Sequence, residues 1–314
     1  MPTPRHILLT GARGMIGKYI LRQLSDNGFR LTDCSQPSDN TADTVTTLGL
    51  SELDNIRGDL RHAVPPVPAI TDTVIHCAGA NPGSPNSVTE IRGLRNLLEG
   101  LSKCHVGDFV FLSSTDVYGK TEGTDITEDE DTEPVSEFGR MKLEAEHILT
   151  EWSEANSCRL CILRCAPVVG TGMEGPLRKL VNDIYRGSYR HIAGNEARTS
   201  VVHATDVAAM SVAMMGKSGI YNLTDGVNPT RHDLAEALSW RMGNKRILTI
   251  DSKKGRRLAK INDWIPFVRF NSEMIKEQTT TLTFSAEKII VDAGIRPHSV
   301  TDYLRTHNYD ENSL

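Results

Sequence analysis

Short apolar runs alternate with helix-period stretches along the first half of the chain, and this alternation restricts its fold more than any other feature. Apolar runs of strand length occur at 6–10, 29–34, 73–77, 108–112 and 160–163, and stretches with helical spacing occur at 15–27, 88–101 and from 138 onward. Strands that alternate with helices are typical of a parallel sheet with helices on both faces. The sequence therefore predicts a doubly wound α/β fold.

The first predicted strand is followed by a glycine-rich turn, Gly11-Ala-Arg-Gly14-Met-Ile-Gly17, which opens the first predicted helix. Glycines permit a tight turn and a close approach of the backbone to a ligand, and a helix N-terminus offers free N–H groups to a phosphate. The spacing is G-x-x-G-x-x-G rather than G-x-G-x-x-G. A tight turn without a ligand is the alternative interpretation.

Further motifs follow in order along the chain: Gly58-Asp59-Leu60, His76-Cys-Ala-Gly79, Ser113-Ser-Thr-Asp-Val-Tyr-Gly119, Lys142, Leu163-Arg164 and His203-Ala-Thr-Asp-Val-Ala208. Together they resemble the extended short-chain dehydrogenase/reductase family of the NAD-dependent epimerase/dehydratase type. This family includes nucleotide-sugar epimerases, dehydratases and 4-ketoreductases. The resemblance runs from about residue 5 to the Gly294-Ile-Arg-Pro segment.

The resemblance implies an NAD(P)-binding Rossmann domain at 1–165, with a return at about 200–218, and a smaller C-terminal substrate lobe at 166–199 and 219–314. It also implies cofactor-binding roles for Gly11, Arg13, Gly14, Met15, Ile16, Gly17, Asp59, Leu60, Ala78, Gly79 and Lys142. Asp59 would reach the adenine amino group, and Lys142 would bind the nicotinamide ribose. A turn-capping Asp59 and a solvated Lys142 are the structural alternatives.

The choice between NAD and NADP depends on the residues after the second predicted strand. A carboxylate there would bind the ribose 2′-hydroxyl and repel a 2′-phosphate. Asp33 is predicted to lie within the strand, and the family's acidic position corresponds to Ser35. Because Arg13 can pair with a 2′-phosphate, the sequence favours NADP.

The predicted active site keeps Ser114 and Lys142 but has Phe138 at the position of the family's catalytic tyrosine. Phenylalanine keeps the ring and loses the acidic proton, and Glu90 replaces a common asparagine. Another proton donor is one explanation, with candidates Glu137, Thr115, Asp116 or a water held by Lys142. Altered chemistry, or a catalytically silent cofactor-binding protein, are the other two.

Three segments in the second half of the chain indicate contacts with a nucleotide-linked sugar. Segments 175–180, 194–200 and 201–203 resemble the substrate lobe of sugar-nucleotide 4-ketoreductases and epimerases, where Arg198 would hold the substrate pyrophosphate. A surface arginine is the alternative. Pro176 departs from the family's asparagine at its position.

Composition excludes some partners. The net charge of −5 argues against nucleic acid, and the absence of an apolar run of about 18 residues argues against a membrane span. No signal-peptide core is visible, so a cytoplasmic protein without a membrane partner is expected. Cys158-Arg-Leu-Cys161 predicts core packing rather than a metal site, because no second ligand pair stands at zinc spacing.

The acidic stretch 121–134 is predicted to be a solvated surface loop, as is the polar stretch 36–47. The helices at 88–101 and 138–152 match the pair that forms an intermolecular four-helix bundle in many family members. Leu94, Leu97, Leu98 and Leu101 would pack either across that interface or within one chain. A homodimer is the resulting expectation.

Overall fold

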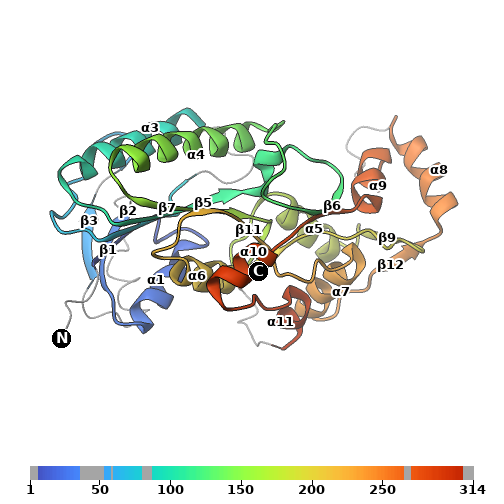
Figure 1. Cartoon of the computed structure of the whole chain (residues 1–314). Helices are drawn as coiled ribbons and strands as arrows, with labels where there is room; N and C mark the ends of the chain where they lie inside the picture. The colour runs from blue at the N-terminus through green and yellow to red at the C-terminus, as the bar shows by residue number, and fades with distance from the viewer. Residues whose placement is uncertain (1–5, 36–52, 58, 80–86, 265–269, 307–314) are drawn as a thin grey trace.

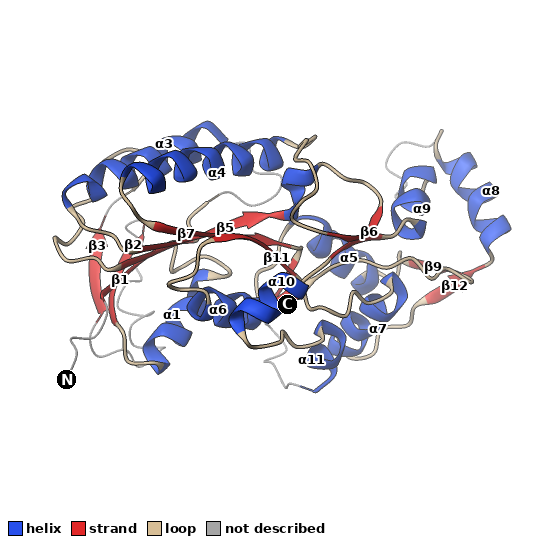
Figure 2. Ribbon diagram, in the orientation of Figure 1, coloured by secondary structure: helices blue, strands red, loops and turns tan. Residues whose placement is uncertain are grey.

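The computed structural model describes residues 6–35, 53–57, 59–79, 87–264 and 270–306. Its centre is a seven-stranded sheet with helices on both faces (Figures 1 and 2). The strands, in the spatial order β11-β7-β5-β4-β1-β2-β3, are Gly219–Leu223, Arg159–Cys165, Asp108–Ser114, Thr73–His76, His6–Thr10, Arg30–Ser35 and Leu53–Arg57. Every neighbouring pair is parallel, so the predicted doubly wound fold is confirmed.

Apolar strands and one-sided helices explain these layers. All five residues of β1 are buried, as expected for a strand covered on both faces. Helix α1 (Gly17–Asp26) buries Ile20, Leu21 and Leu24 against one face of the sheet. Helices α3 (Ser87–Gly100) and α4 (Glu137–Ala155) run side by side over the other face (Figure 1).

The remaining elements complete the sheet's cover and build a lobe beside its carboxyl end. They are η1 (Leu101–Lys103), η2 (Thr115–Tyr118), α5 (Gly175–Tyr185), α6 (Ala204–Ala213), α7 (Arg231–Arg241), α8 (Ser252–Asn262), α9 (Ser272–Thr279), α10 (Glu287–Ala293) and α11 (Val300–Thr306), with strands β6 (Gly123–Ile126), β8 (Val168–Val169), β9 (Arg190–Ile192), β10 (Val202–His203), β12 (Leu248–Ile250) and β13 (Leu282–Phe284). The short strands pair as β10 with β8, β12 with β9 and β13 with β6.

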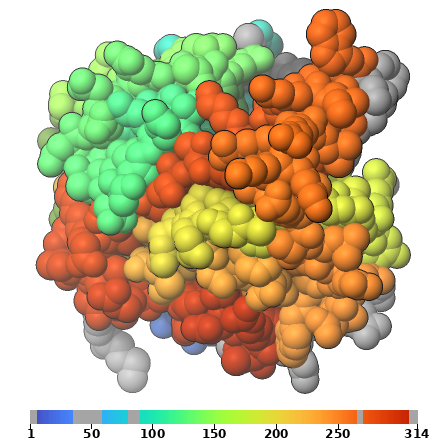
Figure 3. Space-filling view, turned by 90° about the vertical axis from the view of Figure 1, so that its right-hand side faces the viewer, coloured from blue at the N-terminus to red at the C-terminus, as the bar shows by residue number. Residues whose placement is uncertain are grey.

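The lobe has its own apolar core, formed mainly by α5, α7 and α11. Helices α8 and α9 lie at the end of the molecule farthest from β3 (Figure 1), and Figure 3 looks onto this end. One predicted boundary needs correction. Residues 219–223 were placed in the lobe, but they form β11, which pairs with β7 along its whole length as the seventh strand of the main sheet.

The acidic stretch 121–134 is more structured than predicted. It contains β6, which pairs with β13 from the C-terminal part of the chain. Glu128 Oε1 accepts a hydrogen bond of 2.7 Å from the Asn222 backbone N–H, and Glu130 pairs with Lys120 at 2.6 Å. Glu128 therefore links this stretch to β11 of the main sheet. The predicted loop 36–47 lies outside the described residues.

The four leucines that were considered for a dimer interface lie inside one chain. Leu94, Leu97, Leu98 and Leu101 are buried between α3 and the sheet, in one core cluster with Phe109 and Leu149. The intramolecular alternative is therefore correct for these side chains, and they give no support to a dimer.

Of the cysteines of the C-x-x-C motif, Cys161 lies in β7 and Cys158 directly precedes it. Cys161 is fully buried and Cys158 partly buried, and burial raises the pKa of both thiols, to about 12 and about 11. Both thiols are free and behave as small apolar side chains. None of the described helices is long and apolar enough to cross a membrane.

A buried ion pair links the upper helix layer to the sheet near its carboxyl end. Arg164 on β7 donates to both carboxylate oxygens of Glu146 on α4, at 2.8 and 3.2 Å, and the Ser113 hydroxyl donates to the same carboxylate. The Arg164 guanidinium also lies 4.8 Å from the centre of the Tyr118 ring. A bidentate pair of this kind fixes α4, which also carries Phe138 and Lys142.

Candidate functional site

The site lies at the carboxyl ends of the central strands, where the chain leaves β1 in one direction and β4 in the other. Strand β1 pairs with β2 on one side and with β4 on the other, so the connections after β1 and β4 diverge. Ligands of open α/β sheets bind in the crevice at such a point. The glycine turn and the His76-Cys-Ala-Gly79 segment border this crevice.

Three glycines of the turn are required for different reasons. Gly11 has φ of +75°, and a Cβ on it would lie 2.6 Å from the Ala78 nitrogen. A Cβ on Gly17 would lie 2.0 Å from the Gly11 oxygen, so helix α1 could not pack against the turn. A Cβ on Gly14 would meet only the Gly11 oxygen at 3.2 Å. The fold thus needs Gly11 and Gly17, whereas Gly14 leaves open space for a ligand.

The helix that begins here has an uncapped N-terminus. Ile16 is the N-cap residue of α1, without a side-chain cap, and the first turn contains no acidic residue. The positive end of the helix dipole is therefore presented to the crevice. Met15 packs against the core of the lobe, and Ile16 against the core below the sheet. These features fit the pyrophosphate of a dinucleotide, and Arg13 lies in the same turn.

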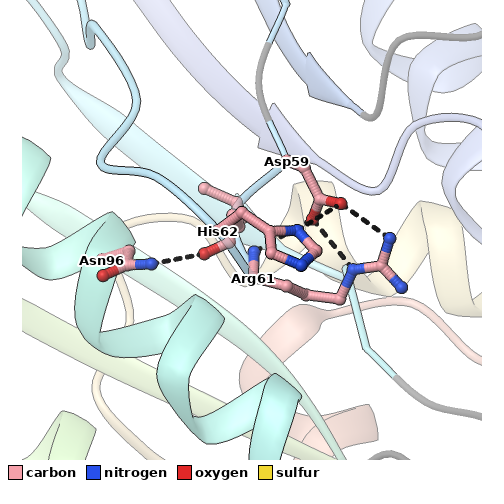
Figure 4. Close-up of polar contacts among 5 residues, drawn as sticks. Asp59, Arg61, His62 and Asn96 are labelled. Atoms are coloured by element: carbon pink, nitrogen blue, oxygen red, sulfur yellow. Dashed lines mark hydrogen bonds and ion pairs between the residues drawn. The ribbon is translucent and has the colours of Figure 1, made fainter.

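Asp59 and Leu60 follow β3, where Figure 4 shows a tight cluster of polar contacts. Asp59 accepts hydrogen bonds from the backbone and guanidinium of Arg61 and from His62, at 2.7–3.0 Å. The Arg61 guanidinium holds the pKa of Asp59 well below its usual value. The Leu60 carbonyl accepts from Asn96. Adenine recognition by Asp59 stays a prediction, and it requires displacement of one partner, of which His62 is the more exposed.

Gly79, Glu90 and Lys142 come together from three parts of the chain. A Cβ on Gly79 would lie 3.2 Å from Glu90 Oε1 and 3.3 Å from Lys142 Nζ. The Glu90 oxygen is buried and has no hydrogen-bond partner among the described residues. Burial raises the pKa of Glu90 to about 7, against the opposing effect of the Lys142 charge. A buried acceptor without a partner fits a ligand hydroxyl at this point.

Lys142 is held between two aromatic rings. Its Nζ lies 5.1 Å from the centre of the Phe111 ring and 5.7 Å from that of Phe138, and it donates to the Leu112 carbonyl at 3.0 Å. Desolvation lowers the pKa of Lys142, and Glu90 partly offsets this. Burial, together with the Lys142 charge, lowers the pKa of His76 to about 3, so His76 is neutral. Phe138 and Lys142 share one helix face, as their spacing of four predicts.

Ser114 ends β5 next to this pair and caps η2. Its hydroxyl oxygen accepts from the Asp116 N–H at 3.1 Å, which leaves the hydroxyl proton for another acceptor. Desolvation raises the pKa of Asp116, whose carboxylate accepts a long bond of 3.4 Å from Ser136. Thr115 is buried and Glu137 exposed. Of the proton donors suggested by the sequence, Asp116 is the acid nearest in the chain to Ser114.

Two lobe residues also have defined places. Arg198 is exposed, and its guanidinium donates to the Asn228 carbonyl at 2.9 Å. No described contact ties Arg198 to the crevice, so its role with a pyrophosphate stays a prediction. Pro176 lies in the first turn of α5, a position that suits proline because it needs no N–H donor.

The comparisons with known proteins agree with this arrangement. The model of the NAD dependent epimerase/dehydratase family matches residues 7–224, which is more than half of the chain. The chain belongs to this family. The match spans the sheet from β1 to β11 and includes the glycine turn, Glu90, Ser114, Phe138 and Lys142.

Individual relatives are more distant. The chain is 25% identical over 237 residues to a sterol-4-alpha-carboxylate 3-dehydrogenase, decarboxylating, of Dictyostelium discoideum, covering 71% of this chain and 72% of the relative. It is 29% identical over 189 residues to a UDP-glucose 4-epimerase of Azospirillum brasilense, covering 55% of this chain and 51% of the relative. The chain thus spans only about half the length of the second relative.

Among solved structures, the UDP-glucose 4-epimerase from Bifidobacterium longum, in complex with NAD+ and UDP, superposes with a TM-score of 0.70. The identity is 20%, with 98% of this chain and 96% of that chain covered, so this likeness concerns the fold. The family is described as NAD dependent, and the leaning towards NADP finds no support in these comparisons. Asp33 is buried within β2, as the sequence predicts.

Glu90 is the site residue whose importance the sequence did not reveal. It was noted there only as a departure from the family's asparagine. Its position against Gly79 and Lys142 depends on the packing of α3 beside α4, which brings residues 79, 90 and 142 together. An acidic residue in the first turn of a predicted helix has a simpler explanation in the helix dipole, so no sequence signal separates the two roles.

We predict that Gly14→Ala weakens NAD binding at least about tenfold, because the added methyl group occupies the space left for the phosphates. The Gly11 oxygen needs to move only slightly, so the thermal midpoint should change little. Calorimetric titration with NAD measures the affinity. Gly107→Ala is the matched control, since its Cβ would meet nothing closer than 3.5 Å, at the opposite end of the sheet. Unchanged affinity in Gly14→Ala would contradict a phosphate site.

We also predict a pH-dependent stability effect of Glu90→Gln. The folded pKa of Glu90 is raised from 4.5 to about 7, so the folded state holds a proton that the unfolded chain releases, and stability is lost as pH rises through this range. Glutamine removes this loss. In urea unfolding, the variant should gain about 1–2 kcal/mol relative to the native protein between pH 5 and pH 8. Glu99→Gln, exposed on the same helix, should show no such change. A pH-independent difference for Glu90→Gln would refute the prediction.

Proposed function

We propose that this protein is an NAD-dependent epimerase/dehydratase or ketoreductase that acts on a nucleotide-linked sugar, with Phe138 at the position of the usual catalytic tyrosine. The observation that carries the proposal is the convergence of Lys142, Glu90 and Gly79 at the crevice opened by the glycine turn. A buried carboxyl oxygen that has no hydrogen-bond partner among the described residues, beside a buried ammonium group, is typical of a site that binds or transfers protons.

The chain's own residues suit the holding of NAD. The turn around Gly14 and the N-terminus of α1 would receive the pyrophosphate, and Lys142 with Glu90 would bind a ribose hydroxyl. NAD would supply the hydride acceptor of the reaction. The apolar rings of Phe111 and Phe138 keep water away from Lys142, which strengthens its electrostatic effect on any group that changes charge nearby.

The remaining task is proton transfer to or from the sugar. Ser114 can orient a sugar hydroxyl through its own hydroxyl proton. Asp116 and Glu90 are acids whose pKa values are raised, so each can exchange a proton nearer to neutral pH than an ordinary carboxyl group. We assign the acid/base role to this pair of positions, in place of the missing phenol. Arg198 would contact the substrate pyrophosphate if the lobe closes over the crevice.

The alternative function is a catalytically silent NAD-binding protein that acts as a sensor or scaffold. One observation favours it: Phe138 leaves the site without the phenol, whose loss costs about 10²–10⁴-fold in rate when it is the positioned acid. Measured turnover of a substrate distinguishes the two functions. Incubation with NAD and UDP-sugars, followed by chromatography of the products, tests the first function, and saturable NAD binding without any product supports the second.

We predict that Phe138→Tyr raises turnover of a UDP-sugar by about 10²-fold, because the phenol would lie one helical turn from Lys142, whose charge favours the phenolate. Initial rates with saturating NAD measure the effect. Phe138→Leu is the control, since it removes the ring without adding an acid. If Phe138→Tyr leaves turnover unchanged while Asp116→Asn abolishes it, the proton path runs through the carboxyl group instead.

We further propose a homodimer through the outer faces of α3 and α4. Arg92 and Arg95 are exposed on α3, and Glu144 and Glu151 are exposed on α4, so a two-fold pairing of the helices can set opposite charges against each other. Light scattering at micromolar concentration should give twice the 34.6 kDa of one chain. Arg95→Glu should shift the mass towards the monomer. A single-chain mass at every concentration would exclude the dimer.

A further inference from the structure

Helix α8 carries exposed apolar side chains at the tip of the lobe. Leu258, Ile261 and Trp264 are 44%, 62% and 89% exposed. They are spaced three residues apart, Trp264 lying just beyond the last helical residue, and residues at this spacing lie on one side of a helix. Three large apolar side chains so close together on the surface indicate a contact with something outside the chain.

The other side of α8 holds the helix on the lobe. Gly255 and Ala259, four residues apart, are buried against a small core cluster whose further members are Ile192, Ile250, Phe270 and Ile275. The Asp251 side chain caps the helix start, and Asp263 at its end accepts two hydrogen bonds from Ser272 of α9. The helix is therefore fixed with its apolar stripe directed away from the lobe core, at the end of the molecule seen in Figure 3.

The same helix is strongly basic. It contains the exposed residues Lys253, Lys254, Arg256, Arg257 and Lys260, and no acidic residue occurs within Ser252–Asn262. The whole chain has a net charge of −5, so this concentration of positive charge is local. A local concentration of positive charge favours contact with an anionic surface.

Nucleic acid and an anionic bilayer are two partners that could bind this positive charge. The exposed apolar side chains Leu258, Ile261 and Trp264 distinguish between them. Nucleic acid binding depends on contacts of basic and polar groups with phosphates, and leaves Leu258 and Ile261 without a role. An anionic bilayer accommodates both features, because Trp and aliphatic side chains enter the boundary between headgroups and acyl chains while Lys and Arg remain at the headgroups. We propose that α8 docks this protein on the surface of an anionic lipid bilayer.

This proposal goes beyond the proposed function and revises the expectation of no membrane partner. That expectation concerned a membrane span, whereas a helix that lies in the interface is neither long nor uniformly apolar. Helices α3 and α4 lie away from α8 (Figure 1), so docking through α8 does not require their surfaces.

The test is co-sedimentation of the full chain with vesicles. The probes are vesicles of phosphatidylcholine alone and vesicles in which about a third of the lipid is phosphatidylglycerol. We expect at least about tenfold tighter binding to the anionic vesicles, weakened by salt of about 0.5 M. Tryptophan emission should shift to shorter wavelength on binding, and the shift should disappear in Trp264→Phe.

Two sets of variants separate the contributions. Ile261→Ser with Trp264→Ser should weaken binding to anionic vesicles about tenfold or more, and so should Arg256→Gln with Arg257→Gln and Lys260→Gln. Trp240→Ser is the matched control, since Trp240 is 47% exposed on α7 of the same lobe and should not matter. Absence of vesicle binding overturns the proposal. Binding that survives Ile261→Ser with Trp264→Ser also overturns it, and tight binding of these variants to RNA would identify the surface as a nucleic-acid contact.

Discussion

The crevice beside β1 is the constraint on which the rest of the structure depends. Because β1 lies between β2 and β4, the connections that leave these parallel strands diverge and leave a crevice between them. Gly11 lies against Ala78 so closely that no side chain fits between them. This contact sets the distance between the glycine turn and Gly79, which faces Glu90 and Lys142. The buried pair of Glu146 and Arg164 then fixes the helix that carries Lys142.

Local sequence patterns predicted what local forces determine. The strand at 6–10, the glycine turn and the helix from residue 138 were predicted from apolar spacing and glycine, and the structure begins that helix one residue earlier, at Glu137, with Ser136 as its cap. Strand β6 was missed because Gly123–Ile126 is exposed and polar over most of its length, and its partner β13 lies more than 150 residues away. The extent of the return to the sheet was misjudged because β11, Gly219–Leu223, reads as one more short apolar run of the lobe.

Among the site residues, too, those related by local spacing were predicted and those related by distant contacts were not. Phe138 and Lys142 were paired by their spacing on one helix, and the Lys142 ammonium group does lie over the Phe138 ring. Glu90 could not be recognised, because its meaning arises from a contact between two helices and the segment after β4. The structure also shows what Phe138 contributes. Its ring lies against the Lys142 ammonium group, and it has no proton to exchange.

The pairing of β6 with β13 has a consequence for the order in which this chain acquires its structure. Residues 123–126 reach their partner only at 282–284, and the Ser200 hydroxyl accepts from the Phe284 N–H in the same region. Contacts between such distant segments slow folding, because the chain entropy must be lost before the contact forms. During synthesis, the main-sheet strands up to β7 can pair before β13, at Leu282–Phe284 of the 314-residue chain, leaves the ribosome. A chain that ended before residue 282 would lack β13 and would leave β6, within the acidic stretch, without its partner strand.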